Sequence, residues 1–146
     1  MRIIFIAFLL INYVNGELIR DNITNTVLDT NTLIMWQDDE DSKTLELTWQ
    51  DSIDYCENNV SLAGYTNWRL PNVNELNYII DNSIHSPAIN SIFVNIESYT
   101  GGFWSSTTYM KPNVQNEAWY VDFIYGDTKT RDKSLTNHVR CIRNFN

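Results

Sequence analysis

Glycine, cysteine and histidine are scarce in this sequence, and each shortage excludes a kind of site. There are five glycines among the 146 residues. The only Gly-Gly pair, at positions 101–102, opens a predicted strand, so no glycine loop is available to hold a phosphate group. The two cysteines and two histidines do not have the spacing of zinc ligands. Collagen-like, coiled-coil and solenoid repeats are also absent from the sequence.

The sequence contains no apolar run that could span a bilayer, which takes about 20 residues. Its longest run, residues 3–11, follows Arg2 and precedes Val14-Asn15-Gly16, which is small enough for a cleavage site. This pattern predicts a signal peptide at residues 1–16 and a mature chain that begins at Glu17. An N-terminal core strand or an uncleaved anchor is the alternative. We expect an exported protein, in the periplasm, at the cell surface or secreted, with no membrane span after cleavage.

Basic residues are also few. Ten lysines and arginines face eighteen aspartates and glutamates, which gives a net charge of −8. Removal of residues 1–16 takes away only Arg2, so the mature chain is more negative still. This balance opposes binding to nucleic acid or to an anionic membrane surface. The mature length, residues 17–146, suits a single domain with its own core.

Two helices can be read from their start signals. Thr48 can accept a hydrogen bond from the backbone N–H of Asp51, whose carboxylate can reach back, and Asn72 with Glu75 repeats this capping pattern. The first helix would bury a stripe of residues at spacings of three and four, and so would the second. The first stripe is Trp49, Ile53, Cys56 and Val60, and the second is Val73, Leu76, Ile79 and Ile80.

The remainder of the chain has the pattern of β-strands. Residues 26–28 and 33–37 flank a polar turn, and segments 103–109, 118–125 and 138–143 are rich in β-branched and aromatic residues. Gly126-Asp127 supplies the positive φ of a tight hairpin. Helices in the first half and strands in the second predict an α+β domain, with two helices packed on an antiparallel sheet.

In an oxidising compartment, the two cysteines are most simply a pair, Cys56 with Cys141. The alternative is a catalytic Cys141 with His138 as its partner. On an alternating strand those two side chains would point to opposite faces, which favours the disulfide.

Six segments, taken in order, resemble the family typified by the C-terminal domain of the Legionella collagen-like adhesin. The segments are Leu33-Ile34-Met35-Trp36-Gln37, Leu47-Thr48-Trp49-Gln50, Asn67-Trp68-Arg69-Leu70-Pro71, Phe103-Trp104-Ser105-Ser106-Thr107, Ala118-Trp119-Tyr120-Val121-Asp122-Phe123 and Val139-Arg140-Cys141-Ile142-Arg143. The resemblance implies an exported bacterial protein whose fold is similar to C-type lectins and sulfatase-modifying factors. It also implies adhesion, in the type member to sulfated glycosaminoglycans, although the strong negative charge of this chain departs from that member.

The lectin-like resemblance suggests a search for a calcium site. Lys111-Pro112-Asn113 resembles the Glu-Pro-Asn segment of calcium-dependent lectins, but an ammonium group stands where a carboxylate ligand belongs. The acidic run 38–41 lacks the alternate spacing of an EF-hand loop, and we interpret it as a solvated turn. We therefore predict neither a metal nor a cofactor.

Alternation along the sixth segment separates core residues from candidate ligand contacts. Trp119, Val121 and Phe123 would share one face and belong to the core, which leaves Tyr120 and Asp122 facing outward. The predicted ligand-binding residues are Tyr109, Lys111, Asn113, Tyr120 and Asp122. Arg69 could bind an anion, but we favour a structural pair with a carboxylate.

We expect a non-enzymatic, exported binding or adhesion module that recognises an extracellular ligand such as a carbohydrate or a matrix component. The alternatives are a periplasmic hydrolase, a relative of the formylglycine-generating oxidases, and a structural subunit of a surface assembly. The sequence argues against the enzymes, because both cysteines are assigned to structure and no two carboxylates have convergent spacing.

Overall fold

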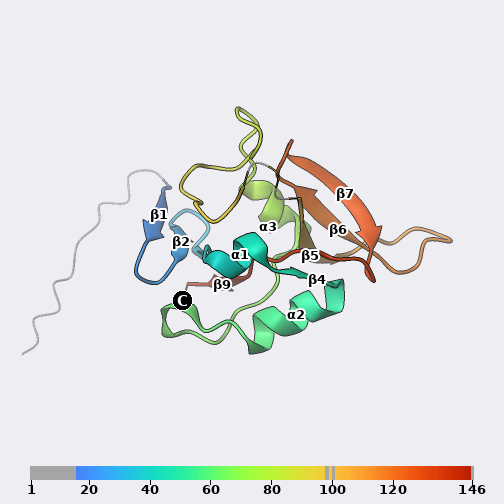
Figure 1. Cartoon of the computed structure of the whole chain (residues 1–146), viewed down its shortest axis with the longest axis horizontal. Coiled ribbons are helices and arrows are strands. Elements are labelled where there is room, and N and C mark those ends of the chain that lie inside the picture. The colour runs from blue at the N-terminus through green and yellow to red at the C-terminus, as the bar shows by residue number, and fades with distance from the viewer. Residues whose placement is uncertain (1–15, 98, 100, 146) are drawn as a thin grey trace, which may run out of the picture.

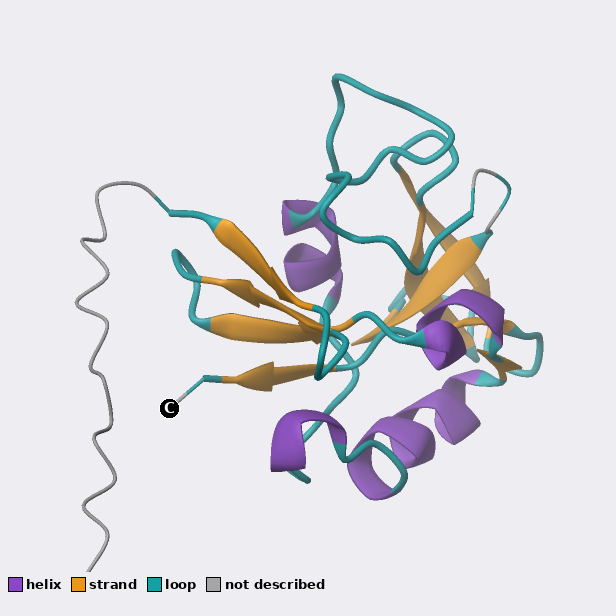
Figure 2. Ribbon diagram, turned by 60° about the vertical axis from the view of Figure 1, so that its left-hand side comes forward, coloured by secondary structure: helices purple, strands orange, loops and turns teal. Residues whose placement is uncertain are grey.

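Two β-sheets set at an angle to each other form the framework of the molecule (Figures 1 and 2). The structure is a computed structural model that describes residues 16–97, 99 and 101–145. All of the predicted signal peptide except Gly16 lies outside these residues. The elements in chain order are β1 (Leu18–Asp21), β2 (Thr26–Asp29), β3 (Ile34–Gln37), α1 (Glu40–Thr44), β4 (Glu46–Leu47), α2 (Trp49–Asn58), the 3-10 turn η1 (Leu62–Gly64), α3 (Val73–Tyr78), β5 (Gly102–Thr108), β6 (Glu117–Asp122), β7 (Asp127–Asp132), β8 (Asn137–His138) and β9 (Ile142–Asn144).

The first sheet has the strand order β1-β2-β3-β9 and is antiparallel throughout. The second has the order β4-β8-β5-β6-β7, in which only the short β5–β8 pair is parallel. The predicted α+β class is therefore confirmed, although the strands divide into two sheets rather than one. Strand β9 pairs with β3 at the edge of the first sheet. The last described strand therefore lies beside a strand from the first third of the sequence.

Both predicted helices are present with the predicted caps. Thr48 Oγ1 accepts from the Asp51 N–H at 3.3 Å, and the Asp51 carboxylate accepts from the Thr48 hydroxyl rather than from its N–H. At α3, Asn72 and Glu75 form the reciprocal capping box. The two helices pack on strands of the second sheet, α2 against β5 and α3 against β5 and β6. None of the helices within the described residues is long and apolar enough to cross a bilayer.

Hydrophobic side chains gather in two clusters. One joins the first sheet and α3 to the second sheet, and its fully buried members include Trp36, Leu76 and Phe103. The other lies under α2 and includes Trp104 and the cystine. The neighbours Phe103 and Trp104 point to opposite faces of β5 and so enter different clusters.

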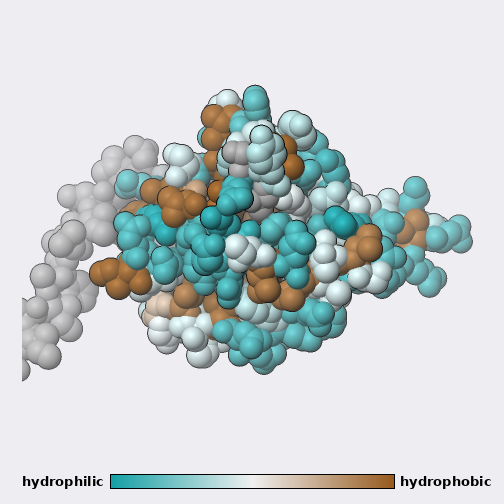
Figure 3. All heavy atoms as spheres, viewed as in Figure 1, coloured by the Kyte–Doolittle hydropathy of each residue, from teal (hydrophilic) through white to brown (hydrophobic). Residues whose placement is uncertain are grey.

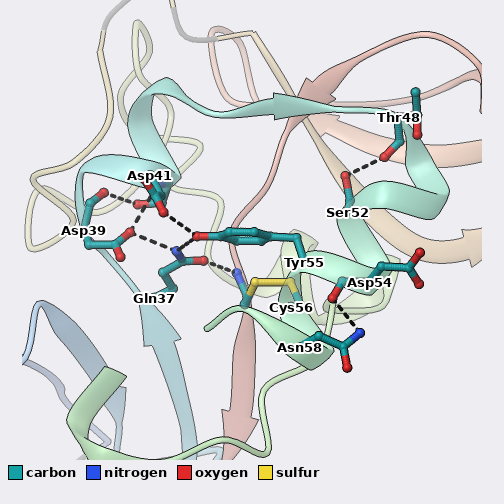
Figure 4. The surroundings of a disulfide bond; sticks show 11 residues. Gln37, Asp39, Asp41, Thr48, Ser52, Asp54, Tyr55, Cys56 and Asn58 are labelled. Carbon is teal, nitrogen blue, oxygen red and sulfur yellow. Dashed lines mark hydrogen bonds between the residues drawn. A yellow bond between two sulfur atoms is a disulfide. The ribbon is translucent and has the colours of Figure 1, made fainter. Parts of the chain in front are cut away.

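The predicted disulfide between Cys56 and Cys141 is confirmed, and a buried glutamine completes its surroundings (Figure 4). Gln37 Oε1 accepts from the Cys141 N–H at 2.9 Å, while its Nε2 donates to the Tyr55 hydroxyl at 3.1 Å and to Asp39 Oδ1 at 2.9 Å. The Tyr55 hydroxyl donates to Asp41 at 2.7 Å. Burial of the ring, together with Asp41, raises the Tyr55 pKa, so the phenol stays protonated.

The acidic run 38–41 is not the solvated turn predicted from sequence. Asp38 is fully buried, and its carboxylate pairs with the buried guanidinium of Arg140, with an N–O distance of 2.6 Å, and also with Arg20. Backbone N–H groups of residues 94 and 95 also donate to Asp38. Burial lowers the pKa of Arg140 to about 9, which still leaves it charged at neutral pH. Asp39 caps α1 and Asp41 accepts from Tyr55, so three members of the run have structural roles.

Candidate binding surface at the tip of the five-stranded sheet

The loop between β5 and β6, residues 109–116, projects from one end of the second sheet (Figure 1). It continues the hairpin, because the Tyr109 N–H donates to Glu117 O and the Val114 N–H donates to Lys111 O at 3.0 Å. Pro112 and Asn113 occupy the centre of this turn, and Asn113 has a φ of 68°. Proline followed by a residue with positive φ is the pattern of a type II turn. The Lys-Pro-Asn segment is thus the apex of a hairpin.

The loop encloses an open cavity of about 540 Å³, lined by residues 108–116. Lys111 and Asn113 are exposed at its apex, and Met110 is 84% exposed beside them. In Figure 3 this lobe is mostly hydrophilic with an apolar patch. Within the described part of the chain, Lys111 has no carboxylate partner.

Two aromatic rings support the base of the loop. Tyr109 meets Trp119 edge to face, with 5.0 Å between ring centroids. Trp119 is half-buried and lies outside both core clusters, so its prediction as a core residue was wrong. Its neighbour on the same face, Val121, is buried where α3 covers the sheet. The sheet extends beyond that cover, which leaves Trp119 only partly shielded.

The second part of this end of the sheet is formed by Lys133, which the sequence analysis did not select, and by Trp49, which it assigned to the buried stripe of the first helix. Lys133 Nζ lies 3.7 Å from the centroid of the Trp49 ring and donates to Thr108 Oγ1 at 2.9 Å. The Trp49 indole is itself fixed by donation to Ser105 O at 2.8 Å. A cation over an indole face in this way is attracted by the ring quadrupole.

These groups line a second open cavity, of about 440 Å³. Its lining residues are Thr48, Trp49, Gln50, Asn116, Lys133 and Ser134. Asn116 lines both cavities, and its backbone carbonyl accepts from the Lys133 N–H at 2.8 Å. We call the two adjoining cavities together with Lys111 and Lys133 the tip surface. Pairing of Lys133 with Trp49 spans most of the chain, so no local sequence signal could reveal it.

The other two predicted ligand contacts do not belong to the tip surface. Tyr120 packs against Trp104 at 6.2 Å on the opposite face of β6 from Trp119, and it lies over the backbone of Gly102. Asp122 sits at the far end of β6, where it accepts from Lys129 Nζ and from the Ile124 N–H. The structure thus brings Tyr109, Lys111 and Asn113 together and separates them from Tyr120 and Asp122.

Arg69 has the structural role favoured by the sequence analysis. Its two terminal nitrogens donate to the two oxygens of Glu75 at 2.9 and 2.7 Å, and it also donates to Asn144. Burial opposes ionisation of Glu75, but the hydrogen bonds from Arg69 and from the Asn72 N–H outweigh it and lower the Glu75 pKa. The guanidinium therefore locks the segment before α3 to the helix and to the C-terminal strand.

Nowhere in residues 16–97, 99 and 101–145 do three or more acidic, histidine or cysteine side chains gather in a way that could hold a metal ion. Comparison with curated proteins finds no match. Comparison with protein families finds a match to the Lcl C-terminal domain over residues 25–143. Of the described elements, these residues include β2 to β8, most of β9, the helices and both cysteines, whereas β1 lies before the match. The chain therefore belongs to the Lcl C-terminal domain family.

Proposed function

We propose that this protein is an exported, non-enzymatic binding module that holds an extracellular ligand at the tip surface. The observation that carries the proposal is the pair of adjoining cavities with Lys111 and Lys133, two lysines without carboxylate partners among the described residues. In a chain with eighteen acidic residues, two lysine cations that are not neutralised by a carboxylate within the described residues are suited to contact a partner. Membership of an adhesin-associated family supports the same role.

The chemistry of the tip surface suits a polar ligand such as a carbohydrate or a matrix component. Trp49 and Tyr109 offer aromatic surface, while Asn116 and Gln50 offer amide donors and acceptors. Aromatic rings and amide groups give contact area and hydrogen bonds at small entropic cost, and both rings here are half-buried. The ligand would occupy an open surface rather than an enclosed pocket.

The proposal contains no catalytic step. The catalytic pair considered from sequence was Cys141 with His138, and Cys141 is bonded to Cys56. His138 packs on the Phe103 ring and lies 3.2 Å from a Glu46 oxygen. Burial lowers the His138 pKa, with Glu46 opposing and Arg140 adding to the effect, which favours the neutral ring at pH 7.

The test is a screen of the mature chain, residues 17–146, against immobilised glycans and matrix proteins, followed by titration of each hit. Lys111→Ala and Lys133→Ala should each weaken binding by about fivefold or more, the effect of losing a lysine contact at an interface. Lys129→Ala is the matched control, because Lys129 is already paired with Asp122 and Asp127 away from the loop. Hits whose affinity is unchanged in both tip variants would place the binding surface elsewhere.

Binding at the tip surface should not require calcium, because a lysine occupies the lectin-like position of the loop. Titration in the presence of a calcium chelator should give the same affinity as titration without it. A chelator that abolishes binding while the circular dichroism spectrum is unchanged would contradict this part of the proposal.

A further inference from the structure

A tyrosine at the end of α3 separates two open cavities, neither of which shares a lining residue with the tip surface. The first, of about 220 Å³, lies between β3 and α3. The second, of about 230 Å³, lies between β1 and the segment that follows α3. Tyr78 is the lining residue that the two cavities have in common, so they lie on different sides of its side chain.

The Tyr78 ring is held in an exposed position. Tyr78 is 55% exposed, although Leu76 in the same helix is fully buried. The side-chain amide of Asn31, in the turn between β2 and β3, donates to the Tyr78 hydroxyl at 2.8 Å, so the ring reaches from α3 to the first sheet. An aromatic ring that is both exposed and fixed gives contact area to a ligand at small entropic cost.

The charges around these cavities indicate an uncharged occupant. Among the described residues, the two linings contain no lysine, arginine or histidine, and their two carboxylates are those of Glu75 and Asp81. Both oxygens of Glu75 accept from Arg69. Asp81 accepts from the backbone N–H and the hydroxyl of Ser83. A sulfate or phosphate group would meet only negative charge here, and a cation would find both carboxylates already hydrogen-bonded.

Asparagine side chains lie on both sides of the ring. Asn72 and Asn74 line the first cavity, and Asn82 and Asn90 line the second. Asn74, Asn82 and Asn90 are exposed. Within the described part of the chain, the Nδ2 atoms of these four residues donate to no other group, while the Oδ1 atoms of Asn72 and Asn90 accept from backbone N–H groups. The amide donors are therefore available to oxygen atoms of a ligand.

We propose that the two cavities together bind a neutral disaccharide unit of a glycan, with one sugar ring on each side of Tyr78. A pyranose has an apolar C–H face, which can pack on the tyrosine ring, and hydroxyl oxygens, which can accept from the asparagine amides. Each cavity alone is below the range of about 300–1,000 Å³ that is usual for ligand sites, whereas the two together fall within it. This Tyr78 site is independent of the tip surface, and either can exist without the other.

A glycan suits the Tyr78 site better than an extended peptide does. Peptides commonly bind by adding a strand to the free edge of a sheet. Strand β3, which lines the first cavity, is already paired with β2 on one side and β9 on the other. The hydrogen bonds available there come from side-chain amides rather than from an unpaired strand.

The experiment is an NMR titration of the ¹⁵N-labelled mature chain, residues 17–146, with backbone resonances assigned by triple-resonance methods. The probes are two neutral disaccharides, cellobiose and diacetylchitobiose, with glucose and the uncharged peptide N-acetyl-trialanine amide for comparison. At least one disaccharide should shift the Tyr78 and Asn82 resonances to saturation. It should bind about tenfold or more tightly than glucose, because one sugar ring can occupy only one of the two cavities.

Variants locate the bound disaccharide. Tyr78→Ala should weaken its binding by about threefold or more, because the sugar loses the aromatic ring, whereas Tyr78→Phe keeps the ring and should bind within about twofold of the unmodified chain. Tyr125→Ala is the matched control, because Tyr125 is exposed and lines neither cavity. If Tyr78→Ala does not fold, Asn74→Trp and Asn82→Trp, at exposed positions, each fill one cavity and should lower the affinity to that of glucose.

Four results would overturn the proposal. The first is the absence of a saturable shift with either disaccharide, and the second is a shift confined to residues of the tip surface. The third is an affinity for the peptide that equals the affinity for the disaccharide. The fourth is an affinity that is the same in Tyr78→Ala as in Tyr78→Phe or, where Tyr78→Ala does not fold, one that neither tryptophan variant lowers.

Discussion

Tyr120 and Gly102 show how closely side chain and backbone approach in the second sheet. A Cβ atom added to Gly102 would lie 2.2 Å from a carbon of the Tyr120 ring, and that ring is itself held against Trp104. Only a residue without a side chain allows the ring to lie over the strand in this way. Gly102 is therefore needed because it leaves space for the Tyr120 ring. Tyr120, which was predicted as a ligand contact, instead packs within the sheet.

Gly102→Ala should lower the free energy of unfolding by about 1–3 kcal/mol, because the added methyl group overpacks the site. Gly101→Ala is a control in the adjacent position, where an added Cβ meets no atom within 4 Å. Urea denaturation of both variants checks the prediction. Equal stability of the two variants would show that the Tyr120 ring can move aside without cost.

Asp38→Asn should destabilise the fold by about 3–5 kcal/mol, because it leaves the buried Arg140 without its charge partner. Asp122→Asn is the comparison, since Asp122 pairs with a partly exposed Lys129, and an exposed pair contributes at most about 1 kcal/mol. Thermal and urea unfolding measure both. A small effect at Asp38 would mean that Arg20 and Arg140 can be satisfied by the backbone carbonyls around them.

At the scale of elements, the segment from Arg69 to Tyr78 has acid-dependent stability. The folded-state pKa of Glu75 lies below its ordinary value of 4.5, so ionised Glu75 stabilises the fold above that pH. This contribution is lost as the pH falls through the lowered pKa. Glu75→Gln should therefore cost about 1–2 kcal/mol at pH 7 and much less at pH 3.

Thermal midpoints measured between pH 7 and pH 3 test this expectation. Glu57→Gln is the control, because Glu57 is exposed near the end of α2. It should leave the pH dependence of the midpoint unchanged. If Glu75→Gln lowers the midpoint equally at pH 7 and pH 3, the Arg69–Glu75 pair does not stabilise α3 through its charge.

Elements with local signals were predictable from the sequence, and elements fixed by distant partners were not. The α2 and α3 caps lie within three residues of the groups they satisfy, so Thr48 and Asn72 reveal both helices. Asp38 pairs with Arg140, 102 residues further along the chain, and its burial has no local signature. The short helix α1 was missed although Asp39 caps it locally, because its five residues are too few to display an apolar stripe.

The candidate site divides in the same way. Tyr109, Lys111 and Asn113 lie in one hairpin loop, so sequence proximity was enough to group them. Alternation along β6 placed Tyr120 correctly on the face opposite Trp119, but exposure depends on what covers each face. Tyr120 packs on Trp104 and Gly102, while Trp119 is only half-buried and lies outside both core clusters. Trp49 and Lys133 meet only because β7 returns beside β6.

At the scale of the whole molecule, several connections hold the C-terminal segment against the earlier part of the chain. Cys141 lies directly before β9, which pairs with β3, and Gln37 at the end of β3 binds the Cys141 N–H. The sheet pairing and the Asp38–Arg140 pair join β3 and the residue after it to the C-terminal segment, and the disulfide joins α2 to the same segment. Loss of one connection should therefore leave the topology intact and lower its stability.

Cys56→Ala combined with Cys141→Ala should reduce the free energy of unfolding by up to about 4.5 kcal/mol, because the bridge closes a long loop in the unfolded chain. The residues lie 85 positions apart in sequence, and such a loop loses much entropy when it is closed. Urea denaturation of the oxidised protein, the reduced protein and the double variant measures the effect. The reduced protein and the double variant should agree in midpoint, with native-like near-ultraviolet circular dichroism at low denaturant. A double variant that is as stable as the oxidised protein would show that the β3–β9 pairing and the buried ion pair already restrict the unfolded ensemble as much as the disulfide does.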